Sequence, residues 1–548
     1  MADRKKWALL LSAILLGSGI FLGSSKPDPY DHTRYQELKE ETTDLSDQAI
    51  QRDEDFSVAS GSGANTSYKG KTMTVDESFT THLPLVVLET PEQRPQELHY
   101  WDKEQGKYVE FEDVEPYVEG TISLINNEEG YNHPTDSPEK ESKMKIRMRG
   151  NSSMRYDKHQ YLIKLLHEDG SKNKMNLLGM GKESDWILNI SLIDKSLMRN
   201  KLAYDSASEI MPNVSDSRYC EVIWKENDTY HYEGVYMLVE PVEVSENRVD
   251  VMEQAANLPF MPALLRRDRL KDEGVFIQNT ASWDNTYYGF LEVLYPKEED
   301  ILPGNLEKLN AQIETFEQTL LSENPEEFIK YRDMINMDTF VDYFLINEFF
   351  GNYDAGNNST YIYIDRNGRI SMGPVWDYDG AMDNWFQEAN YNEAAPMANA
   401  PWFSEMVRDP EFIRLLDERF QELRKGVFSD ESMAQYCASY LEELGPAADR
   451  DYARWGYFYT SENLNPHPDG TSRNIDSHYE EIERLLKNLS DHGDWMENHL
   501  RDLVYLSDSS ISDPIISNTW SQLMDTDFLP VLFVGVFFIS IFLIQRGV

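Results

Sequence analysis

Residues 349–384 read FFGNYDAGNNSTYIYIDRNGRISMGPVWDYDGAMDN and combine a β-hairpin pattern with two groups of acids. An apolar alternation at 361–364 and a second apolar run at 370–375 flank the dipeptide Asn367-Gly368. Asn-Gly between two such runs is typical of a two-residue hairpin turn. The sequence therefore predicts a β-hairpin in this stretch.

The acids lie on both sides of the predicted hairpin. Asp354 precedes it, and Asp377 and Asp379 follow it. Because a hairpin brings its two ends together, we expect these carboxylates to meet at one end of a sheet. Hard divalent cations take oxygen ligands, so the pattern predicts a site for a divalent metal or a metal–phosphate complex.

The charge balance narrows the choice of partners. The 548 residues include 97 acids and 51 bases, for a net charge of −46. Such a surface disfavours nucleic acid and would attract a protein substrate rich in Lys and Arg, although it is more often simply the surface of a soluble exported acidic protein. The two cysteines, Cys220 and Cys437, are too few for a disulfide framework, and the sequence leaves one bridge between them open.

Both ends of the chain carry apolar segments. Residues 1–25 begin with a basic stretch and continue with about 17 apolar residues, which predicts a signal anchor or a signal peptide. Residues 526–546 predict a C-terminal transmembrane helix. Basic residues beside both segments favour the cytoplasmic side, so we expect a membrane protein whose large domain lies outside the cytoplasmic membrane.

Between these apolar ends, the sequence predicts a polar linker, then a β-rich region and then a helical region. Residues 26–78 are polar and acidic, which predicts a disordered linker. Residues 79–510 predict the folded domain, with strands and one inserted helix over about 79–242 and mostly helices over about 243–510. This order predicts an α+β, two-lobed fold like that of protein kinases, with a β-rich N-lobe, a helical C-lobe and terminal transmembrane helices.

A Gly/Ser turn joins two of the predicted strands. RGNSS at 149–153 connects an alternating strand at 142–150 to a second strand at 160–166, with Lys158 between them. The backbone N–H groups of such a turn can bind an anion. The alternative is an ordinary hairpin turn without a ligand.

Phosphoryl transfer needs a phosphate cradle, a cation paired with the phosphates, metal-binding acids and a carboxylate that accepts the hydroxyl proton. Asp354 follows an apolar helix predicted at 338–350, Asn358 and Ser359 come four and five residues later, and Asp377 follows the hairpin. This order matches the kinase catalytic loop and metal-binding Asp. The usual His-Arg-Asp and Asp-Phe-Gly motifs are replaced by Asn-Tyr-Asp and Trp-Asp-Tyr.

Four motifs carry a resemblance to a known family. They are RGNSS with Lys158, DWILN at 185–189 with DKSLMRNKLAYD at 194–205, GVYMLVE at 234–240, and the block at 352–384. Over roughly 80–430 the chain resembles the CotH family of spore-coat-type atypical protein kinases. The resemblance implies ATP-dependent phosphorylation of Ser or Thr in proteins with Mg²⁺ or Mn²⁺, Asp354 as the catalytic base and Asp377 as a metal ligand.

The remaining roles are our interpretation. For the metal we predict, besides Asp377, the residues Asn358, Ser359 and Asp379. For ATP we predict Arg149, Gly150, Asn151, Ser152, Ser153, Lys158, Lys164, Arg199 and Glu240. In this interpretation Lys158 or Lys164 pairs with the α- and β-phosphates as a point charge, Arg199 orients the phosphates, and Glu240 meets the adenine.

Two other functions fit parts of the pattern. A non-catalytic scaffold for surface or spore-coat assembly would keep a kinase-like fold without the reaction. A glycoside hydrolase also uses paired carboxylates, but it leaves the basic Gly/Ser turn unexplained. The presence of Asp354, Asp377 and Lys158 together favours catalysis by a kinase acting on a basic, Ser-rich protein.

Overall fold

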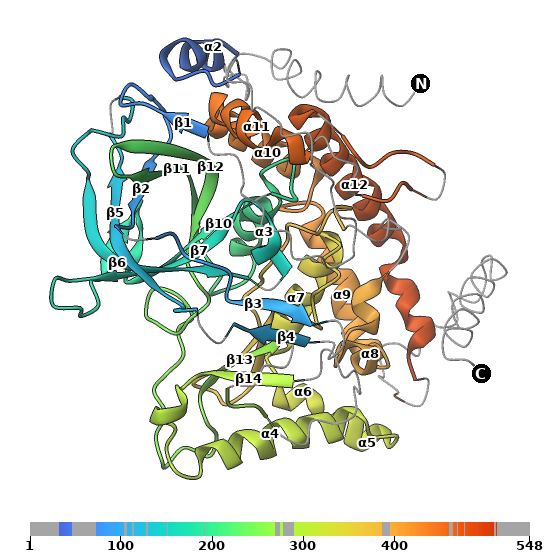
Figure 1. The fold of residues 1–548 in the computed structure, drawn as a ribbon. Helices are drawn as coiled ribbons and strands as arrows, with labels where there is room; N and C mark the ends of the chain where they lie inside the picture. Colours follow the sequence, from blue (N-terminus) through green and yellow to red (C-terminus); the bar gives the residue numbers. More distant parts are fainter. Residues whose placement is uncertain are drawn as a thin grey trace, which may run out of the picture.

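The computed structural model describes residues 32–46 and 73–511, with gaps at 92, 103–106, 112–113, 128–129, 151, 191, 269–273, 278–289, 386–394, 460–463, 468–469, 476 and 509–510. Its helices are α2 (His32–Glu41), α3 (Arg199–Ser208), α4 (Asn305–Leu320), α5 (Pro325–Phe328), α6 (Tyr331–Met334), α7 (Met337–Phe349), α8 (Phe403–Met406), α9 (Pro410–Leu423), α10 (Asp430–Leu444), α11 (Pro446–Tyr459) and α12 (His478–His499). Figure 1 shows a closed sheet on one side of the molecule and α9 to α12 on the other, with α3 between them.

The larger sheet closes on itself. Its strands are β1 (Met73–Val75), β2 (Leu85–Glu89), β5 (Val118–Ile125), β6 (Lys140–Arg149), β7 (Gln160–Leu166), β10 (Asp185–Asn189), β11 (Ser217–Glu226) and β12 (Thr229–Val239). Seven of them follow the order β12-β10-β7-β6-β5-β2-β11, and β11 pairs with β12 to complete the barrel. The alternation in β6 sends Met144, Ile146 and Met148 into the barrel core.

The expected two-lobed, kinase-like fold is wrong, because this sheet closes into a seven-stranded barrel. Closure depends on β11, which pairs in parallel with β2 and antiparallel with β12. An alternating sequence shows which face of a strand is buried, but it does not show which strand lies beside it. Most of the GVYMLVE motif at 234–240 lies in one long strand, β12, whose pairing with β11 shifts register beside Gly234.

Three of the expected segments lie towards the ends of the chain. The transmembrane helices expected at 1–25 and 526–546 fall outside the described residues, and within the described ranges no helix is both long and apolar enough to cross a membrane. Part of the expected linker at 26–78 is ordered, since it contains α2, whose Leu38 is buried. Tyr35 of α2 hydrogen-bonds Asp449 of α11.

A second sheet carries the predicted hairpin. Its strands are β13 (Ala263–Asp268), β14 (Phe290–Tyr295), β15 (Thr360–Ile364) and β16 (Ile370–Met372), in the order β14-β13-β15-β16. Strands β15 and β16 pair antiparallel, which confirms the hairpin, but their last pair is Ile364 with Ile370. A five-residue loop, 365–369, therefore joins them instead of a two-residue Asn-Gly turn, and the Gly368 N–H donates to the Asp365 carbonyl within it. Two small hairpins, β3 (His99–Asp102) with β4 (Lys107–Glu110) and β8 (Met175–Leu177) with β9 (Met180–Glu183), complete the strands.

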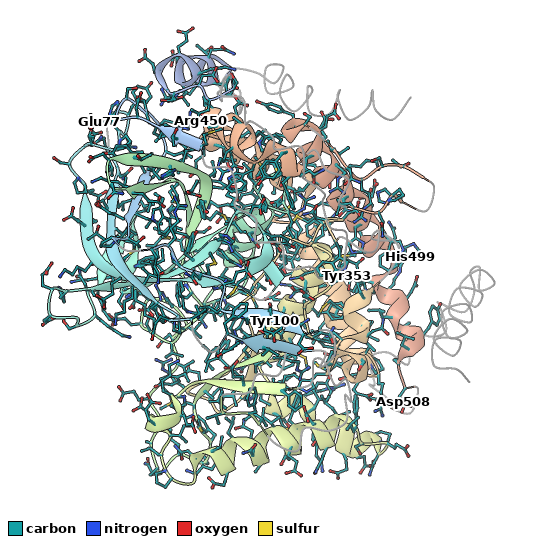
Figure 2. All side chains as sticks on the ribbon, in the orientation of Figure 1. Glu77, Tyr100, Tyr353, Arg450, His499 and Asp508 are labelled. Carbon is teal, nitrogen blue, oxygen red and sulfur yellow. The ribbon has the colours of Figure 1, made fainter. Side chains whose placement is uncertain are left out.

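Helix α11, which the sequence analysis did not foresee, fastens the barrel to the helical part. Arg450 forms a fully buried ion pair with Glu221 of β11 and also donates to Thr42 and Thr81. Figure 2 places Arg450 at the end of the molecule where α2 and α11 lie. The cysteines Cys220 and Cys437 are buried and are not bonded to each other.

Candidate active site

The hairpin brings the predicted acids together. Asp354 lies in the turn after α7, and Asp377 and Asp379 follow β16. Asn358 Nδ2 donates to Asp354 Oδ1 at 3.2 Å, and Ser359 Oγ donates to Asp377 Oδ2 at 3.2 Å. Four residues predicted for metal binding or catalysis therefore form two hydrogen-bonded pairs, which lie together because Asn358 and Ser359 are adjacent in the chain. Asp379 lies two positions after Asp377. We call residues 377–384 the acid loop.

The acids perturb one another. Burial raises the pKa of Asp377 to about 6, and the Asp354 carboxylate contributes to this rise, while Arg149 acts in the opposite direction. Burial and the Asp377 carboxylate likewise raise the pKa of Asp379 well above its usual value. A cation bound here would relieve this repulsion, because a nearby positive charge favours the ionised form of a carboxylate.

The backbone around the acids is strained. Ser359 has a φ of 46° and Asp377 a φ of 69°, in the left-handed region that side chains other than Gly rarely adopt. Hydrogen bonds hold the second position: Tyr204 OH accepts from the Asp377 N–H at 3.3 Å, and Asn200 Oδ1 accepts from the Tyr378 N–H at 2.7 Å. Such conformations cluster at functional sites, where surrounding contacts maintain them.

The Gly/Ser turn faces this cluster through Arg149. The Arg149 guanidinium lies 5.2 Å from the centre of the Trp376 ring, and Tyr204 stacks on Trp376 at 5.6 Å. Burial lowers the pKa of Arg149, and Tyr361 and Asp377 counteract it. The predicted phosphate-binding arginine therefore lies against the residue that precedes Asp377.

Gly150 shapes the turn. Its φ is 110°, and a Cβ there would lie 2.0 Å from Ser153 Oγ, so only glycine fits. Ser152 begins a short 3₁₀ helix, η1 (Ser152–Arg155), and Asn151 lies outside the described residues. Ser153 Oγ accepts a hydrogen bond from Gln160 Nε2 at 2.7 Å.

Lys158 is not where the sequence analysis placed it. It is fully buried, and its Nζ donates to Asp451 Oδ1 at 2.8 Å and to the Val235 carbonyl at 2.7 Å. Lys158 therefore joins α11 to the barrel instead of facing the acids. Lys164, the other predicted phosphate-binding lysine, lies on β7 with its Nζ 5.0 Å from the centre of the Tyr117 ring.

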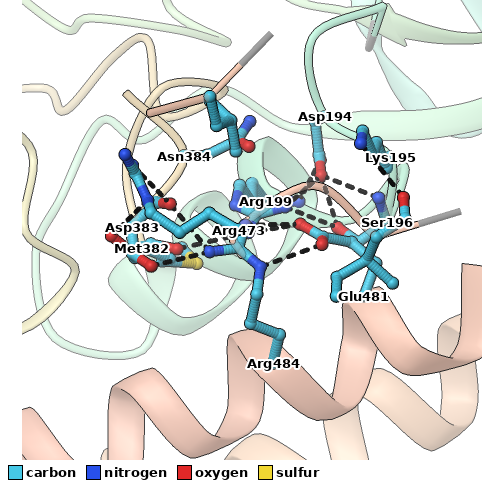
Figure 3. Close-up of polar contacts among 12 residues, drawn as sticks. Asp194, Lys195, Ser196, Arg199, Met382, Asp383, Asn384, Arg473, Glu481 and Arg484 are labelled. Atoms are coloured by element: carbon cyan, nitrogen blue, oxygen red, sulfur yellow. Dashed lines mark hydrogen bonds and ion pairs between the residues drawn. The ribbon is translucent and has the colours of Figure 1, made fainter. Parts of the chain in front are cut away.

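Arg199 is also a structural group. Its side chain is fully buried, and it donates from Nε to the Ala381 carbonyl at 3.1 Å and from Nη2 to the Met382 carbonyl at 3.2 Å. Two carboxylates neutralise its charge: Asp194 Oδ1 lies 2.5 Å from Arg199 Nη1, and Glu481 Oε1 lies 2.8 Å from Arg199 Nη2. Figure 3 shows this arrangement, in which Arg199 holds the acid loop in place instead of pointing at a phosphate.

The end of the acid loop is fixed to α12 by the same network. Asp383 pairs with Arg484 at 2.7 Å and with Arg473 at 3.1 Å, and Arg484 also pairs with Glu481 at 2.8 Å. All these side chains are buried or nearly so. We call Arg199, Asp383, Glu481 and Arg484 the clasp.

Glu240, expected to meet adenine, is buried after the end of β12. Its Oε2 accepts from the Asp216 N–H at 3.0 Å, and its own N–H donates to the Asp216 carbonyl at 3.1 Å. Burial raises the pKa of Glu240. This reciprocal pair ties the end of β12 to the residue before β11, so the carboxylate already has a structural partner.

The oxygen atoms around Asp377 fit a divalent cation that also binds phosphates. Asn358 Oδ1 is buried and accepts no hydrogen bond from the described part of the chain, although its Nδ2 is anchored on Asp354. No group of three or more His, Cys, Asp or Glu residues within the described ranges could hold a metal by itself. Mg²⁺ usually combines one or two carboxylates with substrate phosphates, so Asp377 with Asn358 and Ser359 suits it better than a closed protein cage would.

Several residues of this site were not predicted. Asn189 and Asn200 lie within DWILN and DKSLMRNKLAYD, so the motifs marked the right stretches without indicating a role. Gln160 pairs in register with Arg149 across β6 and β7. The predicted hairpin of residues 142–150 and 160–166 could have indicated that Gln160 lies beside Arg149, because residues opposite each other in a sheet share a face.

Clustered acids opposite an arginine and a glycine turn are features expected of a phosphoryl-transfer protein. The family model described as CotH kinase protein matches residues 146–492, more than half of the chain. The chain therefore belongs to the CotH kinase family, and this membership supports a kinase-like function. No curated protein matches the chain.

The position of Lys158 leads to a prediction. Lys158→Met should destabilise the fold by about 3–5 kcal/mol, because it leaves the buried Asp451 carboxylate without its cation. Nucleotide affinity of the folded variant should stay within about twofold of wild type. Chemical denaturation and calorimetric titration with MgADP measure the two quantities. A stable variant that no longer binds nucleotide would show that the sequence interpretation of Lys158 was right.

The clasp predicts a pH dependence of stability. Burial opposes ionisation of Glu481, but Arg484 and Arg199 outweigh it and lower its pKa from 4.5 to about 2. A lowered pKa in the folded state stabilises the protein above pH 4.5, and this stabilisation disappears as the pH falls towards 2.

Glu481→Gln should therefore cost about 3 kcal/mol at pH 7 and progressively less from pH 4.5 towards pH 2, measured as the free energy of unfolding. Glu480→Gln, one residue earlier and exposed, is the control and should change little. A difference from wild type that is the same at pH 7 and pH 3 would argue against a charged Glu481.

Proposed function

We propose that this protein is an ATP-dependent protein Ser/Thr kinase in which Asp354 accepts the proton of the substrate hydroxyl and Asp377 binds Mg²⁺ or Mn²⁺. One observation carries the proposal: the hairpin brings Asp354 and Asp377 into one cluster that faces Arg149 at a glycine turn. Phosphoryl transfer needs little besides positioning and charge stabilisation, which these groups supply.

In this proposal each group has one task. Asp377, Asn358 and Ser359 would hold the cation, which neutralises charge on the transferred phosphoryl group. Arg149 and the backbone of residues 150–153 would bind phosphate oxygens. Asp379 would lie beside the ligands and sharpen the negative potential that attracts the cation. Lys158, Arg199 and Glu240 would contribute only by supporting the fold.

Asp354 is suited to accept a proton from a protein substrate. Asn358 Nδ2 orients its carboxylate through Oδ1. The neighbouring Tyr353 is 38% exposed and lies near the middle of the view in Figure 2, so this turn reaches the surface. A serine hydroxyl on another protein could therefore approach from solvent, and a carboxylate placed in this way typically accelerates transfer by about 10²–10⁴.

The substrate and the location follow from charge. A net charge of −46 favours a basic, Ser-rich protein over nucleic acid. We also propose that the domain acts outside the cytoplasmic membrane, as the basic residues beside the apolar ends of the sequence predict. Protease added to intact cells should degrade the domain, and full protection would contradict this location.

The reaction can be tested with the purified full chain, labelled ATP, Mg²⁺ or Mn²⁺ and a basic Ser-rich protein. Asp354→Asn should lower kcat by about 10²–10⁴ with little change in nucleotide affinity. Asp377→Asn should lower kcat comparably and raise the metal concentration required. Asp338→Asn, an exposed Asp on α7, is the control and should match wild type. EDTA should abolish transfer, and added metal should restore it.

Three outcomes would change the proposal. No transfer with any metal, including transfer to the protein itself, would favour the non-catalytic scaffold. An unchanged rate in Asp377→Asn would contradict the metal-dependent kinase. An unchanged rate in Asp354→Asn alone would contradict only the assignment of the proton acceptor.

A further inference from the structure

A line of buried amide side chains runs from the acid loop to the Gly/Ser turn. The Tyr378 N–H donates to Asn200 Oδ1 at 2.7 Å, and Asn200 Nδ2 donates to Asn189 Oδ1 at 3.2 Å. Asn189 Nδ2 donates to Gln160 Oε1 at 3.1 Å, and Gln160 Nε2 donates to Ser153 Oγ at 2.7 Å. We call Asn200, Asn189 and Gln160 the amide relay; all three are buried.

Every hydrogen bond in the amide relay runs in the same direction. A side-chain amide has an acceptor oxygen and a donor nitrogen, so fixing one end fixes the other. A backbone N–H can only donate, and the Tyr378 N–H therefore forces Asn200 to present its oxygen. Asn189 and Gln160 must then take the orientations observed. The backbone of the acid loop sets the direction of the whole line.

The consequence appears at Ser153 and Arg149. Because Ser153 Oγ accepts from Gln160, the Ser153 hydroxyl hydrogen is turned away from Gln160 and can be given to another acceptor. Gln160 Oε1 also accepts from Arg149 Nη1 at 3.2 Å, which leaves the other guanidinium N–H groups to bind elsewhere. An anion at the turn would accept these hydrogens.

We propose that Gln160, Asn189 and Asn200 are positioning residues: through one directional line of hydrogen bonds, the backbone of the acid loop fixes Arg149 and the Ser153 hydroxyl as donors for the phosphates of a nucleotide. This inference rests on the proposed function for the identity of the anion. It adds a physical link between the half of the site that holds the metal and the half that holds the phosphates.

Asn189→Asp breaks the line at its centre. The carboxylate that this substitution introduces can still accept from Asn200, but its second oxygen faces Gln160 Oε1, and two acceptors repel each other. Rotating the Gln160 amide by half a turn relieves this repulsion. The rotated amide presents its oxygen to Ser153, which draws the hydroxyl hydrogen inwards, and its nitrogen to Arg149, which loses an acceptor.

Asn200→Asp should also reverse the Gln160 amide, although Asn200 lies one step further than Asn189 from the Gly/Ser turn along the amide relay. It keeps the acceptor for the Tyr378 N–H but loses the donor to Asn189, so Asn189 and then Gln160 must rotate. Asn200 itself hydrogen-bonds no atom of the turn within the described structure. A loss of phosphate affinity in this variant would therefore report transmission along the line.

The test uses the full chain, four single variants and one double variant. Asn189→Asp and Asn200→Asp should each weaken MgADP binding about tenfold by calorimetry and raise KM for ATP similarly, while kcat changes less than about threefold. Asn132→Asp is the matched control, because Asn132 is equally buried and its side-chain nitrogen also donates to a single acceptor, the Leu83 carbonyl. It should lower stability without changing MgADP binding.

Ser153→Ala gives the coupling measurement. If the relay acts through the Ser153 hydroxyl, adding Asn189→Asp to Ser153→Ala should cost clearly less affinity than Asn189→Asp costs alone. Additive effects, or equal MgADP affinities in Asn189→Asp and Asn132→Asp, would overturn the relay. If Asn189→Asp fails to fold, Asn200→Asp and Ser153→Ala still decide the question.

Failure of the relay and failure of the kinase can be told apart. A wild-type chain that transfers phosphate while Asn189→Asp binds MgADP normally would leave the kinase intact and refute the relay. Pyrophosphate serves as the second probe, because it has no nucleoside. Pyrophosphate binding that Asn189→Asp weakens would support the relay even if wild type transfers nothing, and its absence in an inactive wild type would refute both.

Discussion

Three carboxylates in a partly buried cluster repel one another, and much of the surrounding structure keeps them in place. The pKa values of Asp377 and Asp379 are raised, which means that ionising both groups here is unfavourable. Burial and like charges both disfavour ionisation, so the isolated loop would relax by moving the acids apart. Asp377 nevertheless keeps a strained, left-handed backbone conformation in the folded protein. The loop must therefore be fixed by its neighbours.

Three sets of contacts fix it, and each comes from a different part of the chain. The β15–β16 hairpin lies between Asp354 and Asp377 in the chain, and its antiparallel pairing brings these two residues close together in space. The clasp holds the loop's backbone carbonyls and Asp383 against α3 and α12. The amide relay links the Tyr378 N–H to the barrel. Because the barrel and the helices both contact the acid loop, a structural change in either part would move the carboxylates of Asp377 and Asp379.

The features of the fold and the site that could be predicted are local in sequence. Alternation and an Asn-Gly turn predicted the hairpin correctly, and the hairpin predicted that Asp354 and Asp377 would meet. The closed barrel could not be predicted, because closure depends on which strands lie side by side. Lys158 and Arg199 were assigned to phosphates because a basic residue near a turn resembles a ligand-binding group. Lys158 instead pairs with Asp451, 293 residues later, and no local pattern contains that contact.

The central claim is that the acid cluster and the Gly/Ser turn form one metal–phosphate site. An experimental structure of the chain with Mn²⁺ and a non-hydrolysable ATP analogue, with the metal located by its anomalous signal, tests it most directly. We expect manganese within roughly 2.0–2.3 Å of an Asp377 oxygen and of Asn358 Oδ1, with phosphate oxygens bound to Arg149 and to the turn. Metal and phosphates bound elsewhere, with Asn358 Oδ1 and Arg149 contacting neither, would contradict it.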